Sequence, residues 1–420
     1  MERYKEYKDS GVQWLGEIPS HWKQKKMKYS FKERSEKNHP DEPVLCATQS
    51  QGVIPQSMYA NRVVVVNKGF EGLKLVKEGD FVISLRSFEG GIEYAYFQGI
   101  ISAAYTVLEP NNPRESDYWK YLFKSQPYIQ LLQTCVTGIR EGQNINYPLL
   151  SRKMIPVPPL VEQEKIVSYI KSKTSKIDEY IAEKEKEVHL LNELKEAEIA
   201  KVVTQGLNPN VKMKDYDSLI SSSCPEHWSI VRNKSFLSLT GEKVGGRANE
   251  FLLLSLTTKG VIVRDVESGK GKFPKDFDTY QYVRKGELVF CLFDIDETPR
   301  TVGLVEIEGM LTGAYTALKV NPKLALPEYI YNYYLCVDNI KALKPYYSGL
   351  RKTVRADKFL QIYMPLPPLD EQQSIVAHIN EKCAKITSLV SELEAEIDYL
   401  KEYKQRLISD CVTGKINVQS

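Results

Sequence analysis

The sequence predicts an α+β protein built as a tandem duplication, in which a strand-rich globular head is followed by a long α-helix and the pair is then repeated. The first observation is an internal repeat: residues 155–163 have the sequence IPVPPLVEQ, and residues 364–372 have MPLPPLDEQ. The second is that the match continues without a gap, at a constant offset of 209 residues, as far as Thr204 and Thr413. The third is that each copy leads into a long segment without Gly or Pro, in which apolar residues recur with helical spacing.

The heads repeat as well, although their offset drifts. Trp22 corresponds to Trp228 at an offset of 206, whereas Gly138 corresponds to Gly349 at an offset of 211. The heads have therefore accumulated small insertions, while the helical segments kept their length. This difference indicates that helix length is constrained and that the loops of the heads are free to vary. We expect the two tryptophans to be buried anchors of their heads.

Each head has the pattern of a mixed domain with mainly strands. Short apolar runs rich in β-branched or large residues are bounded by Gly, Asn or Asp, which is typical of buried strands. The expected strands are residues 63–66, 80–85, 252–256 and 286–292. Short helices are expected at residues 118–123 and 328–335, before each head closes.

The two long segments, residues 161–205 and 370–413, are each predicted to form one uninterrupted helix. At 1.5 Å per residue, such a helix spans roughly 65 Å. Its ladder positions are spaced alternately four and three residues apart, which is the a/d spacing of a coiled coil. The apolar ladder positions that we expect in the coiled coil and in partner binding are Ile170, Ile177, Ile181, Val188, Leu191, Ile379, Ile386, Val390, Leu393, Ile397, Leu400 and Leu407.

A lone helix of this kind exposes an apolar stripe, and its duplicate is the simplest partner. We therefore expect an antiparallel coiled coil and a pseudo-twofold dumbbell. The alternative is that each helix packs on its own head as an ordinary core helix, but a few turns would suffice for that. The expected domains are a head at residues 1–155, a helical spacer at 156–210, a second head at 211–364 and a second spacer at 365–420.

The composition excludes several classes of protein. The hydrophobic fraction is 42% and the charged fraction is 26%, as in ordinary globular proteins. No apolar run approaches the roughly 20 residues of a membrane span, and the N-terminus lacks the apolar core of a signal peptide. The seven cysteines show no Cys-x-x-Cys spacing, which disfavours a zinc site and favours free thiols. We therefore expect a cytoplasmic protein without a membrane partner.

Charge alternates along the chain. The net charge is +4 over residues 1–155, −2 over 156–210, +4 over 211–364 and −3 over 365–420. The heads are thus mildly basic and the helices acidic. Mild basicity permits contact with nucleic acid without requiring it. Two heads separated by helices of fixed length suit a protein that reads two short DNA sites at a set distance.

Several motifs resemble the specificity subunits of type I restriction-modification enzymes. They are the opening segment, residues 6–22 (EYKDSGVQWLGEIPSHW), residues 99–108 (GIISAAYTVL), the Gly-Ile-Arg of residues 138–140, and above all the repeated Pro-x-Pro-Pro-Leu-x-Glu-Gln. The resemblance covers essentially the whole chain. Small departures, such as a one-residue shift of the glycine that closes each helix, concern linkers only.

The resemblance implies a non-catalytic subunit in which each head is a target-recognition domain for one half of a split double-stranded DNA target. The helices would set the gap between half-sites and dock two methyltransferase subunits, which restriction and translocase subunits then join. S-adenosylmethionine, Mg²⁺ and ATP would belong to those partners, with no cofactor on this chain. The sequence itself contains no phosphate-binding loop, no Gly-x-Gly-x-x-Gly and no Asn-Pro-Pro-Tyr-type methyltransferase motif.

Base recognition requires Arg, Lys, Asn, Gln or hydroxyl side chains on loops that reach the DNA grooves. The candidates in the two heads are Lys68, Arg86, Ser87, Arg140, Gln143, Asn144, Arg300, Arg351, Lys352 and Arg355. Arg140 and Arg351 are best placed, because each follows a glycine that allows close approach of the backbone. Each candidate could instead be a solvated surface charge, and a structural salt bridge would explain the two arginines equally well.

Other interpretations remain open at this point. The aromatic residues Tyr94, Tyr96, Phe97, Tyr346 and Tyr347 could stack on bases, although packing within the heads explains them better. A second function class is a coiled-coil interaction scaffold without DNA specificity. A third is a nuclease acting alone, for which Asp294, Asp296 and Glu297 form an acidic cluster, although the first head has Ser87, Glu89 and Gly90 in that region.

Overall fold

The structure is a computed structural model that describes residues 2–60, 69–138, 144–264, 277 and 279–419. The chain divides into two compact units. The first comprises residues 1–185 and 394–420, and the second comprises residues 186–393. Each unit therefore contains one head together with parts of both long helices.

The head of the first unit contains short strands around a four-stranded antiparallel sheet in the order β4-β11-β8-β9. Two-stranded pairs β1-β2, β3-β14, β5-β6, β7-β10 and β12-β13 surround that sheet. The strands are β1 Tyr7–Asp9, β2 Glu17–Pro19, β3 Lys23–Lys26, β4 Phe31–Arg34, β5 Leu45–Thr48, β6 Gly52–Pro55, β7 Lys74–Val76, β8 Phe81–Ile83, β9 Glu93–Tyr94, β10 Gly99–Ile101, β11 Thr106–Pro110, β12 Val136–Thr137, β13 Asn144–Ile145 and β14 Met154–Val157. The short helices are α1 Ser87–Gly90, α2 Ser116–Leu122, α3 Gln126–Gln133 and α4 Tyr147–Leu150.

The head of the second unit repeats this strand pairing, except that no two-stranded pair among its described residues corresponds to β12-β13. Its four-stranded sheet has the order β18-β25-β22-β23, with two-stranded pairs β15-β16, β17-β26, β19-β20 and β21-β24. The strands are β15 Met213–Asp215, β16 Ser223–Pro225, β17 Ser229–Arg232, β18 Leu237–Leu239, β19 Leu254–Thr257, β20 Gly260–Val263, β21 Gln281–Val283, β22 Leu288–Phe290, β23 Val302–Leu304, β24 Gly309–Leu311, β25 Thr316–Val320 and β26 Tyr363–Leu366. The helices are α6 Pro327–Asn339 and α7 Ala356–Phe359.

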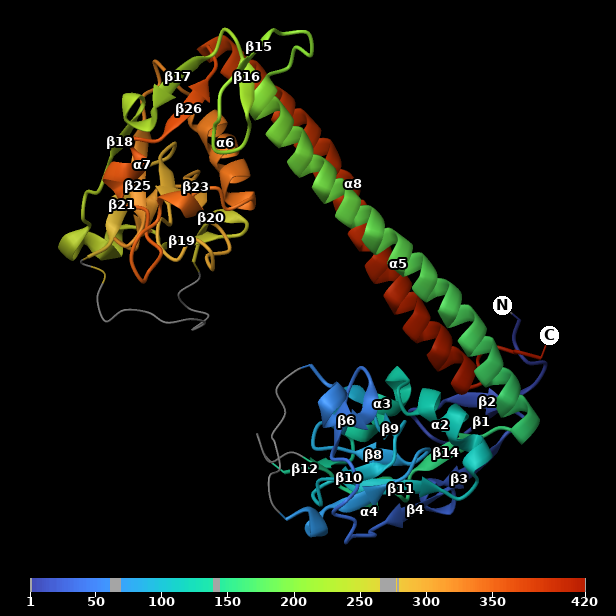
Figure 1. The fold of residues 1–420 in the computed structure, drawn as a ribbon. Helices are drawn as coiled ribbons and strands as arrows, with labels where there is room; N and C mark the ends of the chain where they lie inside the picture. The colour runs from blue at the N-terminus through green and yellow to red at the C-terminus, as the bar shows by residue number, and fades with distance from the viewer. Residues whose placement is uncertain (1, 61–68, 139–143, 265–276, 278, 420) are drawn as a thin grey trace. The chain divides into compact units, whose positions relative to one another are not determined.

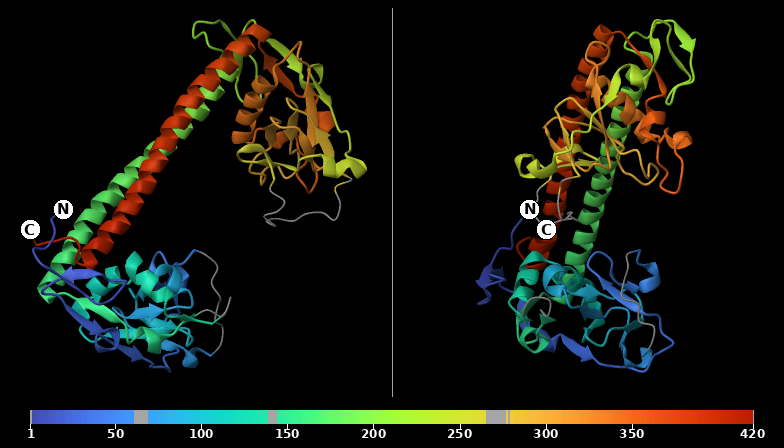
Figure 2. Two further views of the ribbon diagram at one scale, coloured as in Figure 1. Left: turned by 180° about the vertical axis from the view of Figure 1, so that it is seen from behind. Right: turned by 90° about the vertical axis from the view of Figure 1, so that its left-hand side faces the viewer.

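The two long helices are α5 (Leu160–Gln205) and α8 (Leu369–Val412), and they lie side by side in all views (Figures 1 and 2). In the first unit Asp178 and Glu185 of α5 contact Lys404 and Lys401 of α8, respectively. In the second unit Glu198 of α5 contacts His378 of α8. Residue numbers rise along one helix as they fall along the other, so the pairing is antiparallel. The predicted α+β tandem duplication with an antiparallel helix pair is confirmed.

The ends of both helices pack inside the heads. The first turns of α5 contribute Ile166 and Ile170 to the core of head one, and the last turns of α8 contribute Leu407 and Val412 to the same core. In head two the corresponding positions come from the start of α8 and the end of α5, namely Ile375, Ile379, Ile199, Val202 and Val203. The alternative prediction, that each long helix packs on its own head, therefore holds only for the first turns of each helix. Each head also needs the end of the other copy's helix.

Two tyrosines fix these helix ends. Tyr118 of α2 donates a hydrogen bond to the carbonyl of Val412 at 2.8 Å, and Tyr329 of α6 donates one to Val203 at 3.0 Å. Both tyrosine side chains are fully buried, so each satisfies a helix-end carbonyl that has no partner within its helix. The last turn of each long helix is therefore held by a matching hydrogen bond from a buried tyrosine.

The elements differ from expectation mainly in length. The strands expected at 80–85 and 286–292 shorten to β8 and β22, because the following residues turn away into loops. The strand expected at 252–256 is shifted to β19, and the expected strand at 63–66 lies outside the described residues. The short helices expected at 118–123 and 328–335 correspond to α2 and α6.

Two further properties bear on function. Among the residues that the structure describes, no helix has the length and apolar character needed to cross a bilayer. The seven cysteines are all free thiols.

Candidate nucleic-acid interface and its supports

Each head is joined to the start of its long helix through the glutamate of the repeated motif. In the first unit Glu162 accepts hydrogen bonds from Trp22 Nε1 at 2.9 Å and from Tyr4 Oη, and its Oε2 lies 2.7 Å from His21 Nε2. Burial raises the pKa of the Glu162 carboxyl, but the hydrogen bonds from Tyr4, His21 and Trp22 outweigh it and leave the pKa below its usual value. The carboxylate is thus charged and bound by three side chains of the head. We call this contact between a head and the start of its long helix the joint.

The second unit has the same joint. Trp228 Nε1 donates to Glu371 at 3.1 Å, and His227 Nε2 lies 2.7 Å from the same carboxyl group. Nothing equivalent to Tyr4 completes it among the described residues, and Glu371 is 23% exposed in its side chain against 3% for Glu162. The predicted burial of both tryptophans is confirmed, at 0% and 1% exposure for Trp22 and Trp228.

The glycine that closes each long helix lies against the joint of the opposite copy. Gly414 has φ +79°, and a Cβ there would stand 2.4 Å from Pro19 and 3.0 Å from Trp22. Gly206 has φ +73°, and its Cβ would stand 2.7 Å from Glu371. Both positions combine a left-handed backbone with a close approach, so glycine is required at each. The one-residue shift between them in sequence leaves this role unchanged.

In head one, the neighbouring candidates Arg86 and Ser87 differ in exposure. Arg86 is exposed, and its side chain has no hydrogen bond or ion pair with any described residue, so its guanidinium is available. Ser87 is buried at 2% exposure and its Oγ accepts a hydrogen bond from the Ser84 N–H at 2.8 Å. Because Ser87 supports the turn from within, it is not available for DNA contact in this structure. Asn144 is half-buried in β13, and its Oδ1 accepts from the Ile145 N–H.

Three further candidates in head one, Lys68, Arg140 and Gln143, lie outside the described residues.

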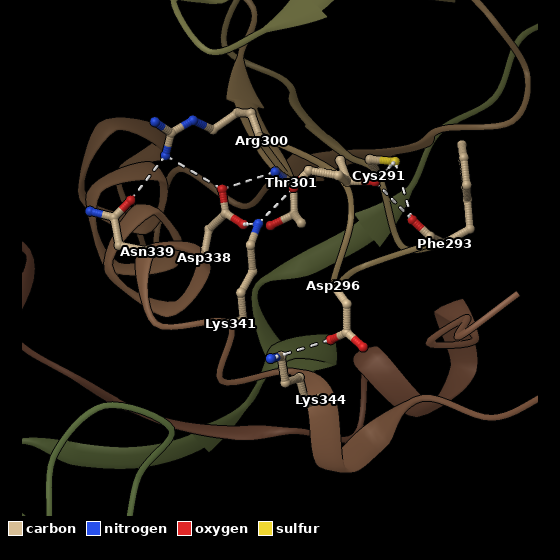
Figure 3. A network of polar contacts seen from close by, with 10 residues as sticks. Cys291, Phe293, Asp296, Arg300, Thr301, Asp338, Asn339, Lys341 and Lys344 are labelled. Carbon is tan, nitrogen blue, oxygen red and sulfur yellow. Dashed lines mark hydrogen bonds and ion pairs between the residues drawn. The ribbon is translucent and has the colours of Figure 1, made fainter. Parts of the chain in front are cut away.

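In head two, Arg300 belongs to an internal network rather than to a free surface. Its Nη1 lies 3.4 Å from Asp338 Oδ2 and 3.2 Å from Asn339 Oδ1, and Figure 3 shows the side chain directed at these two groups of α6. The Asp338 carboxylate, 1% exposed, also accepts from Lys341 Nζ at 2.7 Å and from the Thr301 N–H at 2.9 Å. Arg300 therefore neutralises a buried carboxylate, because an uncompensated buried charge is costly.

The best presented candidate is the turn formed by residues 348–353, which packs against the loop that follows β22. Ser348 and Thr353 exchange two backbone hydrogen bonds, of 3.0 and 3.1 Å. Gly349 and Lys352 both have positive φ, which closes the turn tightly. Leu350 is fully exposed at its tip, and the exposed Arg351 side chain has no hydrogen bond or ion pair with any described residue.

The rest of the head holds the backbone of this turn in place, and the side chains at the tip of the turn stay exposed. The Arg351 carbonyl accepts a hydrogen bond from the Asp294 N–H at 2.9 Å, and the Val354 N–H donates to the Leu292 carbonyl at 2.8 Å. Lys352 Nζ lies 2.9 Å from Asp296 Oδ2, so this lysine helps to anchor the turn. A fixed loop that offers one free guanidinium beside an apolar tip has the chemistry of a groove contact.

Arg355, at the N-cap of α7, pairs with Asp357 at 3.0 and 3.2 Å while both side chains stay largely exposed. In an exposed pair of this kind, the arginine can exchange the carboxylate for a phosphate at little cost.

The acidic cluster that the sequence offered as a metal site is engaged in ion pairs. Asp296 pairs with Lys344 and with Lys352, and Figure 3 shows the contact with Lys344. No group of metal-ligating side chains occurs among the described residues.

The aromatic candidates are partly engaged in packing. Tyr94 packs edge-on against Phe81, and Lys120 Nζ lies 4.5 Å from the ring centre of Tyr96. Tyr96, Phe97 and Tyr346 each keep 39% of their surface exposed. Tyr94 is therefore part of head one's core, whereas the other three remain at the surface.

The expected coiled-coil residues lie at or near the seam. Buried positions are Ile170, Ile181, Ile379, Ile386, Leu393, Ile397 and Leu407, and half-buried positions are Ile177, Val188, Leu191, Val390 and Leu400. The ladder position Lys195 is also half-buried and donates to Thr387 Oγ1 at 3.1 Å. Polar residues in the α5 seam are tolerated because they find partners on α8: Lys184 also pairs with Glu396, and Glu198 pairs with His378.

Two features escaped the sequence prediction. The His-Trp pair near the start of each head and the glutamate of the repeated motif occur at matched places in the two copies, and this match was a sufficient signal for the hydrogen bonds between them. The exposed Leu350 carried no sequence signal, because leucine is normally buried and only its place in the turn exposes it.

Two heads of one topology on an antiparallel helix pair define a two-headed recognition protein. A family model for the type I restriction modification DNA specificity domain matches residues 10–190 and 270–399. The chain belongs to this family, as a specificity subunit with two recognition domains.

Individual relatives agree with this assignment. The specificity subunit of the type I restriction enzyme MjaVIII from Methanocaldococcus jannaschii is 24% identical over 369 residues, covering 82% of this chain and 81% of that protein. The EcoBI specificity subunit of Escherichia coli is 22% identical over 399 residues, with 82% and 81% covered. A chain in a solved structure of a type I R-M system, described for its assembly and conformational transition, matches with a TM-score of 0.67 and 14% identity, covering 95% and 99%. That likeness shows the fold.

Proposed function

We propose that this chain directs a type I restriction-modification complex to a split, asymmetric DNA target. Each head reads one half-site in double-stranded DNA, and the paired helices set the gap between half-sites. The chain itself is not an enzyme, since specificity subunits leave catalysis to partner subunits. Because the proposed substrate is the DNA of the host cell, the proposal places the complex in the cytoplasm.

The observation that carries the proposal is that one strand framework presents two different loops. β8 and β22 occupy equivalent places in the two four-stranded sheets. After β8 the chain forms the short helix α1, with Arg86 at its start. After β22 it forms the Asp294–Thr298 turn that supports Arg351. The same strand framework with different loops suits two different half-sites, because the framework can position each head on the DNA while the loop side chains select the bases.

The available cations support DNA as the ligand. Arg86 in head one and Arg351 in head two are exposed without a described partner, and the basic charge of the chain resides in the heads. Lys68, Arg140, Gln143, Asn144 and Arg355 remain candidates of the same kind. Arginine is suited to guanine edges and to phosphates, because its planar donors can engage two acceptors at once.

The acidic helices are proposed as the dock for two methyltransferase subunits, which restriction and translocase subunits then join. S-adenosylmethionine, Mg²⁺ and ATP are placed on those partners and not on this chain. We also propose the functional division already expected from sequence, with recognition in residues 1–155 and 211–364 and spacing in 156–210 and 365–420.

The decisive experiment is methylome sequencing of host cells with and without this chain. The proposal expects methylation confined to one bipartite motif with a fixed gap, and its loss when the chain is absent. Equal methylation at all sites by the purified complex would refute specificity. A scaffold without DNA specificity predicts that outcome, whereas a nuclease acting alone predicts nicking by the isolated chain with Mg²⁺.

A head exchange sharpens this experiment. Replacing residues 211–364 with the second head of another specificity subunit should change one half-site and leave the other intact. Replacing residues 1–155 is the matched control and should change the opposite half-site. If either exchange altered both half-sites, the heads would not be independent readers.

A further inference from the structure

In head two, a leucine followed by an arginine forms the tip of the turn that packs against the loop after β22. The Lys352 N–H donates a hydrogen bond to the Gly349 carbonyl at 3.0 Å, so Leu350 and Arg351 are the two central residues of a β-turn. Leu350 is fully exposed, and the Arg351 side chain has no hydrogen bond or ion pair with any described residue. A fully exposed leucine gains no stability from burial, and turn tips usually hold Gly, Asn, Asp or Ser instead. Folding therefore does not explain Leu350.

Head one has the same pair of residues at the tip of the same kind of turn. The Ser87 N–H donates to the Ser84 carbonyl at 3.3 Å, and the Ser84 N–H donates to Ser87 Oγ at 2.8 Å, so Leu85 and Arg86 are the central residues. Leu85 is 46% exposed, and the Arg86 side chain again has no partner among the described residues. We call these two segments, residues 84–87 and 349–352, the Leu-Arg turns.

The Leu-Arg turns lie at the same end of equivalent strands, although they come from different parts of the repeat. The first directly follows β8, and the second is bonded to the loop that follows β22, where the Asp294 N–H donates to the Arg351 carbonyl at 2.9 Å. The strand pairing of the two sheets relates Leu85 to Leu292, which is buried at 3% exposure. Head two thus places its exposed leucine there from a segment remote in sequence. The same residue pair, supplied to one place by two different segments, indicates a shared task.

The backbone of the turn in head two is fixed before any ligand binds. The Val354 N–H donates to the Leu292 carbonyl at 2.8 Å, directly after the turn. Lys352 has φ +44°, a left-handed conformation that a lysine rarely adopts, and its Nζ lies 2.9 Å from Asp296 Oδ2. An apolar side chain on a fixed backbone loses little conformational entropy when it is inserted into a ligand.

We propose that Leu350 and Leu85 are wedges that enter the base stack of their half-sites and kink the DNA. The inference rests on the proposed function and adds a second way of reading sequence, through the ease with which a base step opens. Apolar side chains that enter a duplex partly unstack one base step and bend the DNA by roughly 20–90°. The arginine beside each leucine then engages a phosphate or a base edge next to the opened step.

The wedges predict a feature of the DNA target. Pyrimidine–purine steps unstack most easily, so each half-site should contain such a step at the place where the leucine enters. Leu350 is fully exposed whereas Leu85 is half-covered, so Leu350 should enter further and the half-site of head two should bend more. Because leucine carries no charge, removing either wedge should leave the salt dependence of binding unchanged.

The test uses the full chain assembled with its modification subunits, on duplexes that carry the motif found by methylome sequencing. Fluorescence energy transfer between the duplex ends reports bending, and 2-aminopurine placed in turn at each adenine reports unstacking. The wild type should bend the DNA and raise the 2-aminopurine signal at one step in each half-site. Leu350→Ala should abolish the signal in the half-site of head two and weaken binding by about tenfold. Leu85→Ala should abolish the other signal, with a smaller loss of affinity.

Two further variants make the test specific. Leu324→Ala is the matched control, because Leu324 is 46% exposed but follows β25, which runs antiparallel to β22, and so lies beyond the opposite end of the sheet. It should change neither bending nor affinity. Leu350→Met keeps a large apolar side chain and should retain the kink. Urea unfolding of Leu350→Ala should match the wild type, since the side chain is not buried.

The outcomes separate this inference from the proposed function. Sequence-specific binding by the wild type without bending and without unstacking would overturn the wedges and leave the proposed function standing. Absence of any preference for the motif would overturn both. If replacing thymine by deoxyuridine weakened wild-type binding as much as Leu350→Ala does, while every step stayed stacked, Leu350 would contact a thymine methyl group in the groove and the wedge would be refuted.

Discussion

The indole nitrogen of Trp22 donates a 2.9 Å hydrogen bond to Glu162, and Trp228 makes the matching bond of 3.1 Å to Glu371. In each unit this bond links a buried residue of the head to the first turn of a long helix. The carboxylate also lies near the helix N-terminus, where negative charge is stabilised. A head that reads DNA must keep its direction relative to the helix, and this bond is part of what fixes it.

Replacing Glu162 with Gln should destabilise the first unit by about 2 kcal/mol, because charge-assisted bonds from Tyr4, His21 and Trp22 become neutral ones. Urea unfolding followed by circular dichroism measures the loss. Glu371→Gln should cost less, since Glu371 is more exposed and has fewer donors. Glu183→Gln, an exposed change on the same helix, is the control; an equal loss there would remove the joint as the cause.

The joint should also make stability depend on pH in a defined direction. The pKa of Glu162 is lowered in the folded state, so its contribution is present above the unfolded pKa of about 4.5 and is lost as the pH falls through the lower folded value. The stability difference between the wild type and Glu162→Gln should therefore shrink on acidification from pH 7 to about pH 3. A difference that grows at low pH would contradict the lowered pKa.

Replacing Arg351 with Ala should weaken DNA binding without changing stability, because its side chain is exposed and unpaired among the described residues. If Arg351 contacts a phosphate, affinity falls for all sequences and the salt dependence of binding loses about one unit of slope. If it contacts a base, discrimination at one position of the half-site relaxes instead. Fluorescence anisotropy at several salt concentrations distinguishes the two, with the exposed Lys234→Ala as control. Unaltered binding would exclude the turn from the interface.

Replacing Arg300 with Ala should have the opposite effect, with lower stability of the second unit. The change leaves the buried Asp338 carboxylate with Lys341 and the Thr301 N–H but without the guanidinium. We expect a loss of about 1–3 kcal/mol in unfolding experiments. DNA affinity at a temperature where the variant is folded should stay near that of the wild type. A large loss of affinity with normal stability would return Arg300 to the DNA-contacting set.

Inserting four residues after both Lys184 and Leu393 should lengthen the gap between half-sites. Four helical residues add about 6 Å, or roughly two base pairs of 3.4 Å. Methylome sequencing should show unchanged half-sites with a longer gap. Insertion in one helix alone is the control, since it shifts the seam of one helix against the other and should lower stability. An unchanged gap with the double insertion would show that the helices do not set the spacing.

Much of this protein was determined by the sequence alone. A constant offset of 209 residues and ladder positions spaced four and three residues apart predicted the duplication and the paired helices, because helix periodicity is a local property of the chain. The burial of Trp22 and Trp228 was predicted because they occupy equivalent positions in the two copies. The short strands were predicted only approximately, because their ends depend on neighbours that are distant in sequence.

Only the tertiary structure decided which polar side chains are available. Arg300 and Arg351 look alike in the sequence, yet Arg300 is held by the buried Asp338 and Arg351 projects from a turn whose backbone is fixed. The packing of each helix end into the opposite head was likewise invisible, because local pattern does not specify long-range partners.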